Sequence, residues 1–332
     1  MKKRRIFLLI VLSLIVLYLL GPKPESPIYN AEIPELPNIK SIEKYIQLKE
    51  AQFNTRENCQ AQIVWADSSK SETEYSILYL HGFSASHMEG DPVHKNLAKE
   101  FSSNLYLARL QDHGLHSPIN LEKYSPDGVW ESAKEALFIA QKLGEKVIII
   151  STSTGSPIAL KLAAEFPEVV FSLVNLSPNF RIKDPSARIL NDPWGAQIAS
   201  MVIGKTRHVV YENPEAKKYW DTLYSVNALV AMEELIETTT TTSVLSKISC
   251  PVLSLYYYKD EKNQDEVVDV SRIPEIHKEL ASKEEENICK ALASPESHVI
   301  ASSIQSKNYQ IVEDEIREFM ISVLGLKTEN KP

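Results

Sequence analysis

The chain is poor in cysteine and lacks the short motifs that mark metal and nucleotide sites. Its three cysteines in 332 residues, Cys59, Cys250 and Cys289, allow at most one internal disulfide and form no disulfide framework. No pair has C-x-x-C spacing, and the sequence contains no H-E-x-x-H, no G-x-G-x-x-G and no Walker sequence. We therefore expect neither a metal nor a cofactor.

Basic residues are in the minority. The chain has 36 Lys and Arg against 44 Asp and Glu, which gives a formal net charge of -8. Nucleic-acid binding depends on a basic surface, so a nucleic-acid partner is not expected. The sequence also contains no internal repeat, which argues against a solenoid or propeller.

A basic cluster followed by an apolar run occupies the N-terminus. Lys2-Lys3-Arg4-Arg5 precede the almost entirely apolar residues 6–20, and Gly21-Pro22 end the run. This pattern is typical of a membrane-targeting segment, although the run is short for a bilayer. No A-x-A cleavage site follows. We expect residues 1–22 to be an uncleaved signal anchor with the rest of the chain outside the cytoplasm. A protein secreted after cleavage is the alternative.

Proline marks the next segment. Residues 23–40 contain Pro24, Pro27, Pro34 and Pro37, which predict an extended tether. The remaining residues, 41–332, fit one large domain by length and by the continuity of their strand and helix patterns.

The strongest local signal is a serine between a strand and a helix. Residues 147–150 are Val-Ile-Ile-Ile, which is typical of a strand buried on both faces. Apolar residues then recur at helical spacing from Ile158 to Phe166, leaving Ser151-Thr152-Ser153-Thr154-Gly155 for the turn. All five are small, as a nucleophile elbow requires. The usual pattern is G-x-S-x-G, and Ser151 replaces its first glycine. The alternative is a Ser/Thr-rich loop that caps the helix.

Strand and helix patterns alternate around this turn. They predict an α/β fold with a doubly wound, mostly parallel sheet. Its further strands are expected at residues 60–66, 75–80, 104–110, 169–176, 251–258 and 288–293, with helices at 92–101, 130–143 and 312–324. The stretch between the strands ending at 176 and beginning at 251 shows no convincing strand. We expect residues 181–246 to form a helical insertion, with 41–180 and 247–332 as the core.

Together these features resemble an α/β-hydrolase. The strand of residues 75–80 ends in His81-Gly82, and a serine elbow, a carboxylate after a late strand and a histidine before the last helix follow. The order Ser, acid, His is that of this fold. The insertion resembles the lid of monoacylglycerol lipases and related carboxylesterases. The resemblance covers about residues 42–325. It implies a serine-dependent hydrolase acting on a small-molecule or lipid ester.

The resemblance also implies roles for particular residues. Ser153 is the expected nucleophile, and His298, in the loop after the last strand, is the expected base, because a serine hydroxyl needs an imidazole to take its proton. The implied oxyanion donors are the backbone amides of Phe83 and Thr154. His81 is expected to order the oxyanion loop and not to act as the base.

The acid is ambiguous between two aspartates. Counting from the end of the strand at Tyr258 favours Asp260. Counting back from the apolar pair Val267-Val268, which follows the acid closely in the family, favours Asp265. We prefer Asp265 and keep Asp260 as the alternative, with a glutamate of the same loop as a third choice.

Other functions are compatible with the same fold and the same candidate residues. An acyltransferase or thioesterase has the same triad and differs only in the acceptor, and a hydrolase-like binding protein has lost catalysis. Dehalogenases and epoxide hydrolases are disfavoured because they carry aspartate at the elbow. The apolar stretch Gly195–Gly204 favours an uncharged ester whose flexible acyl chain packs against the insertion. In the alternative, the insertion merely packs on the core above a small open site.

Overall fold

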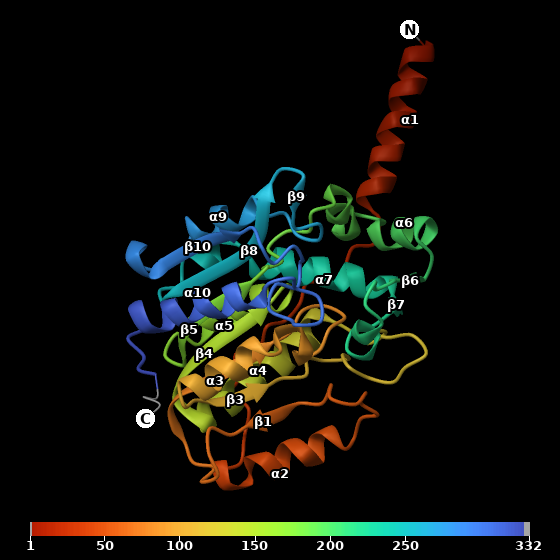
Figure 1. The fold of residues 1–332 in the computed structure, drawn as a ribbon. Helices are drawn as coiled ribbons and strands as arrows, with labels where there is room; N and C mark the ends of the chain where they lie inside the picture. The colour runs from red at the N-terminus through yellow and green to blue at the C-terminus, as the bar shows by residue number, and fades with distance from the viewer. Residues whose placement is uncertain (1, 329–332) are drawn as a thin grey trace.

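One large mixed sheet forms the centre of the molecule (Figure 1). The computed structural model describes residues 2–328. The strand order is β1-β3-β2-β4-β5-β8-β10, and a further strand, β9, pairs with β8. Within this sheet, among the described residues, only the β1–β3 and β8–β9 pairs are antiparallel. The strands are β1 (Gln62–Val64), β2 (Thr73–Leu80), β3 (Asn104–Leu107), β4 (Gly144–Thr152), β5 (Val170–Leu176), β8 (Val252–Asp260), β9 (Asn263–Gln264) and β10 (Asn287–Leu292).

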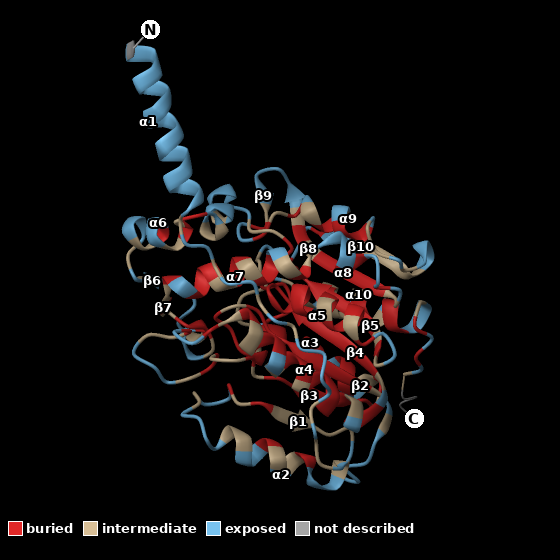
Figure 2. Ribbon diagram, turned by 180° about the vertical axis from the view of Figure 1, so that it is seen from behind, coloured by how far each residue is buried: buried red, intermediate tan, exposed pale blue. Residues whose placement is uncertain are grey.

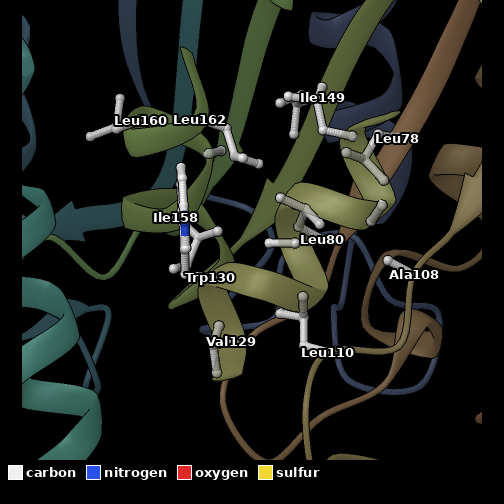
Figure 3. Packing of buried hydrophobic residues seen from close by; sticks show 14 of the residues in the cluster. Leu78, Leu80, Ala108, Leu110, Val129, Trp130, Ile149, Ile158, Leu160 and Leu162 are labelled. Carbon is white, nitrogen blue, oxygen red and sulfur yellow. The ribbon is translucent and has the colours of Figure 1, made fainter. Parts of the chain in front are cut away.

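Helices cover both faces of this sheet. Along β4, Ile148 and Ile150 belong to the core cluster under α3 (Val93–Glu100) and α10 (Tyr309–Ser322). The alternate residues Val147 and Ile149 belong to the cluster under α4 (Pro126–Leu143) and α5 (Gly155–Glu165). Figure 3 shows side chains of this second cluster, with Ile149 and Leu78 from the sheet near residues of α4 and α5. Burial on both faces explains the continuous apolar strands and confirms the expected doubly wound, mostly parallel sheet.

A long insertion separates β5 from β8. It contains α6 (Gly195–Val202), α7 (Val226–Thr239) and α8 (Thr242–Leu245), and the 3₁₀ helices η2 (Pro185–Asn191) and η3 (Pro214–Lys218). The prediction that it has no strand was wrong, because β6 (Thr206–His208) pairs antiparallel with β7 (Leu223–Ser225). Strands of three residues are too short to show a period in the sequence. In Figure 1, α6, β6, β7 and α7 lie together beside one end of the sheet. Helix α9 (Arg272–His277) follows after β9.

The segment predicted to be a tether is attached to the core. Residues 23–38 have no regular structure, but the carbonyl of Asn30 accepts hydrogen bonds from Trp130 Nε1 at 2.7 Å and Lys134 Nζ at 2.8 Å. The ring of Tyr29 meets the Trp130 ring edge to face, with centroids 5.5 Å apart. Helix α2 (Ile39–Glu50), which the sequence patterns did not indicate, begins inside the predicted tether. The middle of the segment is therefore part of the folded unit.

Helix α1 (Lys2–Leu19) projects from the molecule, and its residues 3–19 are exposed (Figure 2). Its last turn contacts the insertion, where Trp194 Nε1 donates to the Leu17 carbonyl at 3.2 Å. It has 18 residues, and its first turn consists of Lys2, Lys3, Arg4 and Arg5, which shortens the apolar part. Among the described residues, none of the helices combines enough length with enough apolar character to cross a membrane. This finding overturns the prediction of a membrane-anchored protein with its catalytic domain outside the cytoplasm.

Candidate active site

Ser153 occupies a sharp corner between β4 and α5. Its backbone has a φ of 52°, in the left-handed region that a residue with a side chain adopts only at a cost of about 1–2 kcal/mol. Hydrogen bonds on both sides hold this conformation. The Ser153 N–H donates to the Leu176 carbonyl, and the Asn179 N–H donates to the Ser153 carbonyl, each at 3.0 Å. The hydroxyl is thereby fixed above the end of the sheet.

Gly155 and Ser151, the small residues on either side of the corner, fit there for different physical reasons. A Cβ on Gly155 would lie 2.4 Å from the Leu80 carbonyl oxygen, so only glycine allows α5 to begin this close to β2. Ser151 stands where G-x-S-x-G has its first glycine and is fully buried. Its Oγ lies 3.0 Å from Asn175 Oδ1 and 3.0 Å from Ser156 Oγ. A serine is accommodated because its hydroxyl has buried polar partners.

The structure brings Ser153 together with His298 and Asp265. His298 Nε2 lies 3.0 Å from Ser153 Oγ, and His298 Nδ1 lies 2.7 Å from Asp265 Oδ2. The other oxygen of Asp265 accepts the backbone N–H groups of Val267 at 2.8 Å and Val268 at 3.1 Å. The carboxylate is therefore held from both sides, and the imidazole lies between it and the serine hydroxyl.

The structure places Asp260 elsewhere. It is exposed at the end of β8, where its Oδ1 accepts the backbone N–H groups of Lys262 at 2.9 Å and Asn263 at 3.0 Å. These bonds shape the tight β8–β9 turn. The side chain of Asp265, by contrast, is 0% exposed. Of the two aspartates, it is Asp265 that contacts His298.

The pKa values of His298 and Asp265 are both shifted from their ordinary values. Burial disfavours the charge on each partner, but the mutual attraction outweighs burial. The Asp265 carboxylate raises the pKa of His298, and His298 together with the backbone amides of Val267 and Val268 lowers the pKa of Asp265. The pair therefore favours an ionised aspartate beside an imidazole that takes up a proton readily.

The amides of Phe83 and Thr154 are available for a ligand. Among residues 2–328, neither N–H group has an intramolecular acceptor. His81 Nε2 accepts the Leu110 N–H at 3.0 Å, so its Nδ1 carries the proton and donates to the Gly82 carbonyl at 2.9 Å. Since C=O and N–H point in opposite directions across a trans peptide, this bond also fixes the direction of the Phe83 N–H. Burial lowers the pKa of His81 to about 4, so it stays neutral at pH 7.

Comparison with known proteins identifies the fold. No protein-family model and no curated protein matches the chain. Among solved structures, one of the metagenome-derived lipolytic enzymes LipS and LipT shares 14% identity at a TM-score of 0.63, covering 81% of this chain and 99% of its own. A soluble variant of monoglyceride lipase from Saccharomyces cerevisiae, in complex with a substrate analog, shares 11% identity at a TM-score of 0.62. The match covers 91% of this chain and 99% of that lipase. The monoacylglycerol lipase of Paleococcus ferrophilus shares 15% identity at a TM-score of 0.58, and the match covers 79% of this chain and 98% of that lipase.

The chain has the α/β-hydrolase fold. This confirms the resemblance drawn from the His81-Gly82 strand end, the serine corner and the order of the later acid and histidine. At identities of 11–15% the likeness extends to the fold, and the roles of individual residues rest on the geometry above.

Within the α/β-hydrolase fold, a cavity of about 640 Å³ extends from Ser153 and His298 into the insertion. Its walls are mainly apolar, and the insertion contributes many of the lining residues, including Ile198, Ala199, Val202, Val209, Leu229 and Met232. Arg207, Asp184 and Glu266 add charged groups to the lining. Within residues 2–328, no cluster of three or more His, Cys, Asp or Glu side chains is arranged to hold a metal ion.

Two residues of the site were missed from the sequence. Asn175 on β5 is buried beside Ser151, and Glu89 of the 3₁₀ helix η1 (His87–Gly90) lines the cavity. Asn175 interrupts the apolar strand Val170–Leu176, and this buried polar position was the available signal. Glu89 has no such signal, because a glutamate in a polar loop is usually exposed.

Proposed function

We propose that the protein is a serine hydrolase that cleaves carboxylic esters through an acyl-enzyme on Ser153. The observation that carries the proposal is the hydrogen-bonded series from Asp265 through His298 to Ser153, which lies at the wall of a largely apolar cavity. The α/β-hydrolase fold and the left-handed backbone at Ser153 support it. The lipolytic and monoacylglycerol lipase activities named for the similar structures support ester hydrolysis as the general class.

The first half of the proposed reaction forms the acyl-enzyme. His298 Nε2 takes the proton of the Ser153 hydroxyl as Oγ attacks the ester carbonyl carbon. The carbonyl oxygen becomes negative and accepts hydrogen bonds from the Phe83 and Thr154 amides. When the carbon–oxygen ester bond breaks, the alcohol leaves with the proton from His298. Asp265 keeps the Nδ1 proton of His298 in place and stabilises the imidazolium.

The second half returns the free enzyme. Water replaces the alcohol, and His298 takes one of its protons as the hydroxide oxygen attacks the acyl carbon. The bond to Ser153 Oγ then breaks, the serine recovers its proton from His298, and the carboxylic acid is released. No oxidant, reductant or other co-reactant is needed.

The cavity supports a substrate with a flexible apolar acyl chain. Residues of α6, β6 and α7 line it together with Ser153, so a chain esterified to Oγ lies against the insertion. Each methylene removed from water there contributes about 0.8 kcal/mol. We therefore propose residues 181–246 as the lid of the domain, and an uncharged acyl ester, of the monoacylglycerol kind or smaller, as the substrate.

Reaction with a fluorophosphonate tests the proposal. The reagent should label the wild-type protein at Ser153, as mapped by mass spectrometry of the peptides. Ser153→Ala should abolish labelling and lower kcat on p-nitrophenyl butyrate by about 10⁴ or more. Ser177→Ala is the matched control, because Ser177 also has a positive φ at a strand end, but its buried hydroxyl has no hydrogen-bond partner among the described residues. Labelling that persists in Ser153→Ala, or that maps to Ser151, would falsify the proposal.

A further inference from the structure

A second buried carboxylate lies at the site and has no part in the reaction described above. Glu89 is 2% exposed and lines the same cavity as Ser153 and His298. It comes from the short 3₁₀ helix η1, and buried glutamates are rare unless a specific partner holds them.

The partner of Glu89 is the oxyanion loop. Glu89 Oε2 accepts the Gly82 N–H at 2.6 Å, and the Gly82 carbonyl is held by His81. Both polar groups of Gly82 are therefore fixed, one residue before the amide of Phe83. This leaves the Phe83 N–H little freedom to turn away from the carbonyl oxygen of a substrate.

Glu89 is also close to the reacting serine. A Cβ built on Gly82 would lie 2.8 Å from Ser153 Cβ and 3.1 Å from Glu89 Oε2. The carboxylate and the Ser153 side chain thus flank the same α-carbon, with no room for a side chain between them. A negative charge at Glu89 therefore acts on the Ser153 side chain at short range.

Among the described residues, three ionisable side chains feel the charge of Glu89. Tyr79 from β2 and Tyr211 from the insertion feel its charge, but burial above all raises the pKa of both tyrosines, so they stay neutral. His298 is the third group, and the negative charge of Glu89 adds to that of Asp265 in raising the pKa of His298. Burial raises the pKa of Glu89 itself to about 7, against the opposing effects of the Gly82 amide, His298 and Trp220. The charge of each group therefore favours the ionised form of the other.

We propose that Glu89 is a positioning residue of this site, where it holds the oxyanion loop through the Gly82 amide and, when ionised, places a second negative charge beside Ser153. The inference rests on the proposed function, since it assigns a role in the same acyl transfer. The hydrogen bond from Gly82 to Glu89 and the negative charge of Glu89 can be removed by different substitutions, so their effects can be measured separately.

Three variants of the full chain separate the two effects. Glu89→Gln removes the charge but keeps an oxygen that can accept the Gly82 N–H. Glu89→Ala removes both. Glu296→Gln is the control, because it removes an exposed carboxylate two residues from His298 that is already paired with Lys307. Two readouts are used: NMR titration of His298, which needs no turnover, and the pH dependence of fluorophosphonate labelling and of kcat/KM for p-nitrophenyl butyrate.

We expect Glu89→Gln to shift the His298 titration and the acid limb of both rate profiles to lower pH. Glu89→Ala should show the same shift and, in addition, lose about tenfold in kcat/KM at the pH optimum relative to Glu89→Gln, because the loop amide is released. Glu296→Gln should titrate like the wild type.

Each part of the inference has its own contrary result. A His298 titration in Glu89→Gln that matches the wild type overturns the charge effect. Equal kcat/KM at the optimum in Glu89→Gln and Glu89→Ala overturns the hold on the oxyanion loop. A wild-type protein that fluorophosphonate does not label overturns the proposed function instead, and that failure is recognised before any Glu89 variant is made.

Discussion

Ser151 Oγ lies 3.0 Å from Asn175 Oδ1, and both residues are fully buried. The contact joins β4 to β5 at the start of the serine corner. It continues across the sheet, because Asn175 Nδ2 donates to Ser254 Oγ on β8 at 3.3 Å, and that hydroxyl lies 2.7 Å from His277 Nε2. The serine that replaces glycine in the motif is thus part of a buried polar chain, and it is more than a tolerated substitution.

The first prediction concerns the energy of this contact. Ser151→Ala leaves the buried Asn175 oxygen without a donor, so the free energy of unfolding should fall by about 1–3 kcal/mol. Urea unfolding followed by tryptophan fluorescence measures it. Asn175→Val alone should also destabilise, whereas the double variant should be more stable than the sum of the two effects implies. Strictly additive losses would show that the two side chains do not interact.

The second prediction concerns the acid. Asp265→Asn should lower kcat by about 10⁴, because an amide cannot hold the Nδ1 proton of His298 or stabilise its positive charge. Asp260→Asn is the matched control and should change kcat by less than about twofold, since Asp260 only shapes an exposed turn. The kcat values of the two variants on p-nitrophenyl butyrate test the assignment. The reverse order of effects would identify Asp260 as the acid and contradict our assignment.

Much of the fold could be predicted because buried strands and helices repeat their apolar residues regularly. The isoleucines of β4 and the helical spacing after Ser153 gave the central strand and the helix that follows it. The order of strands could not be predicted, since β1 pairs with β3 and the sequence between them gives no sign of it. Helix α2 was not predicted, and it begins two residues before the end of the predicted tether.

Some residues of the candidate site could be predicted from the sequence, and others could not. Ser153 and His298 could be found because each lies at a fixed place relative to a strand. Asp265 and Asp260 lie five residues apart in one loop, and only the fold of the β8–β9 turn separates them. Glu89 reaches the site through the path of a loop, which no local pattern encodes. The roles of all four residues in catalysis stay predictions that the experiments described here test.

The third prediction concerns pH. Reaction requires neutral His298, and the Asp265 charge raises its pKa above the ordinary value of about 6.5. Activity should therefore be lost as pH falls through this raised pKa, with a midpoint above pH 6.5. In Asp265→Asn the raising charge is gone, so the midpoint of the residual labelling should move to lower pH. The rate of fluorophosphonate labelling against pH measures both. An acid limb that stays in place in Asp265→Asn would mean that another group controls it.

The last prediction concerns the length of the acyl chain. Ala199 of α6 is 6% exposed and lines the cavity, whereas Met201 on the same helix is 84% exposed and lies outside it. In the wild type, kcat/KM for p-nitrophenyl esters should rise about fourfold per methylene until the cavity is full, which corresponds to about 0.8 kcal/mol each. Ala199→Phe fills part of that volume, so its optimum should move to a shorter chain while its rate on the acetate changes little. Met201→Ala should keep the wild-type profile, and thermal unfolding checks that both variants are folded. If the wild type hydrolyses acetate best and loses efficiency steadily from butyrate onward, the insertion only packs on the core, and the enzyme is a short-chain esterase.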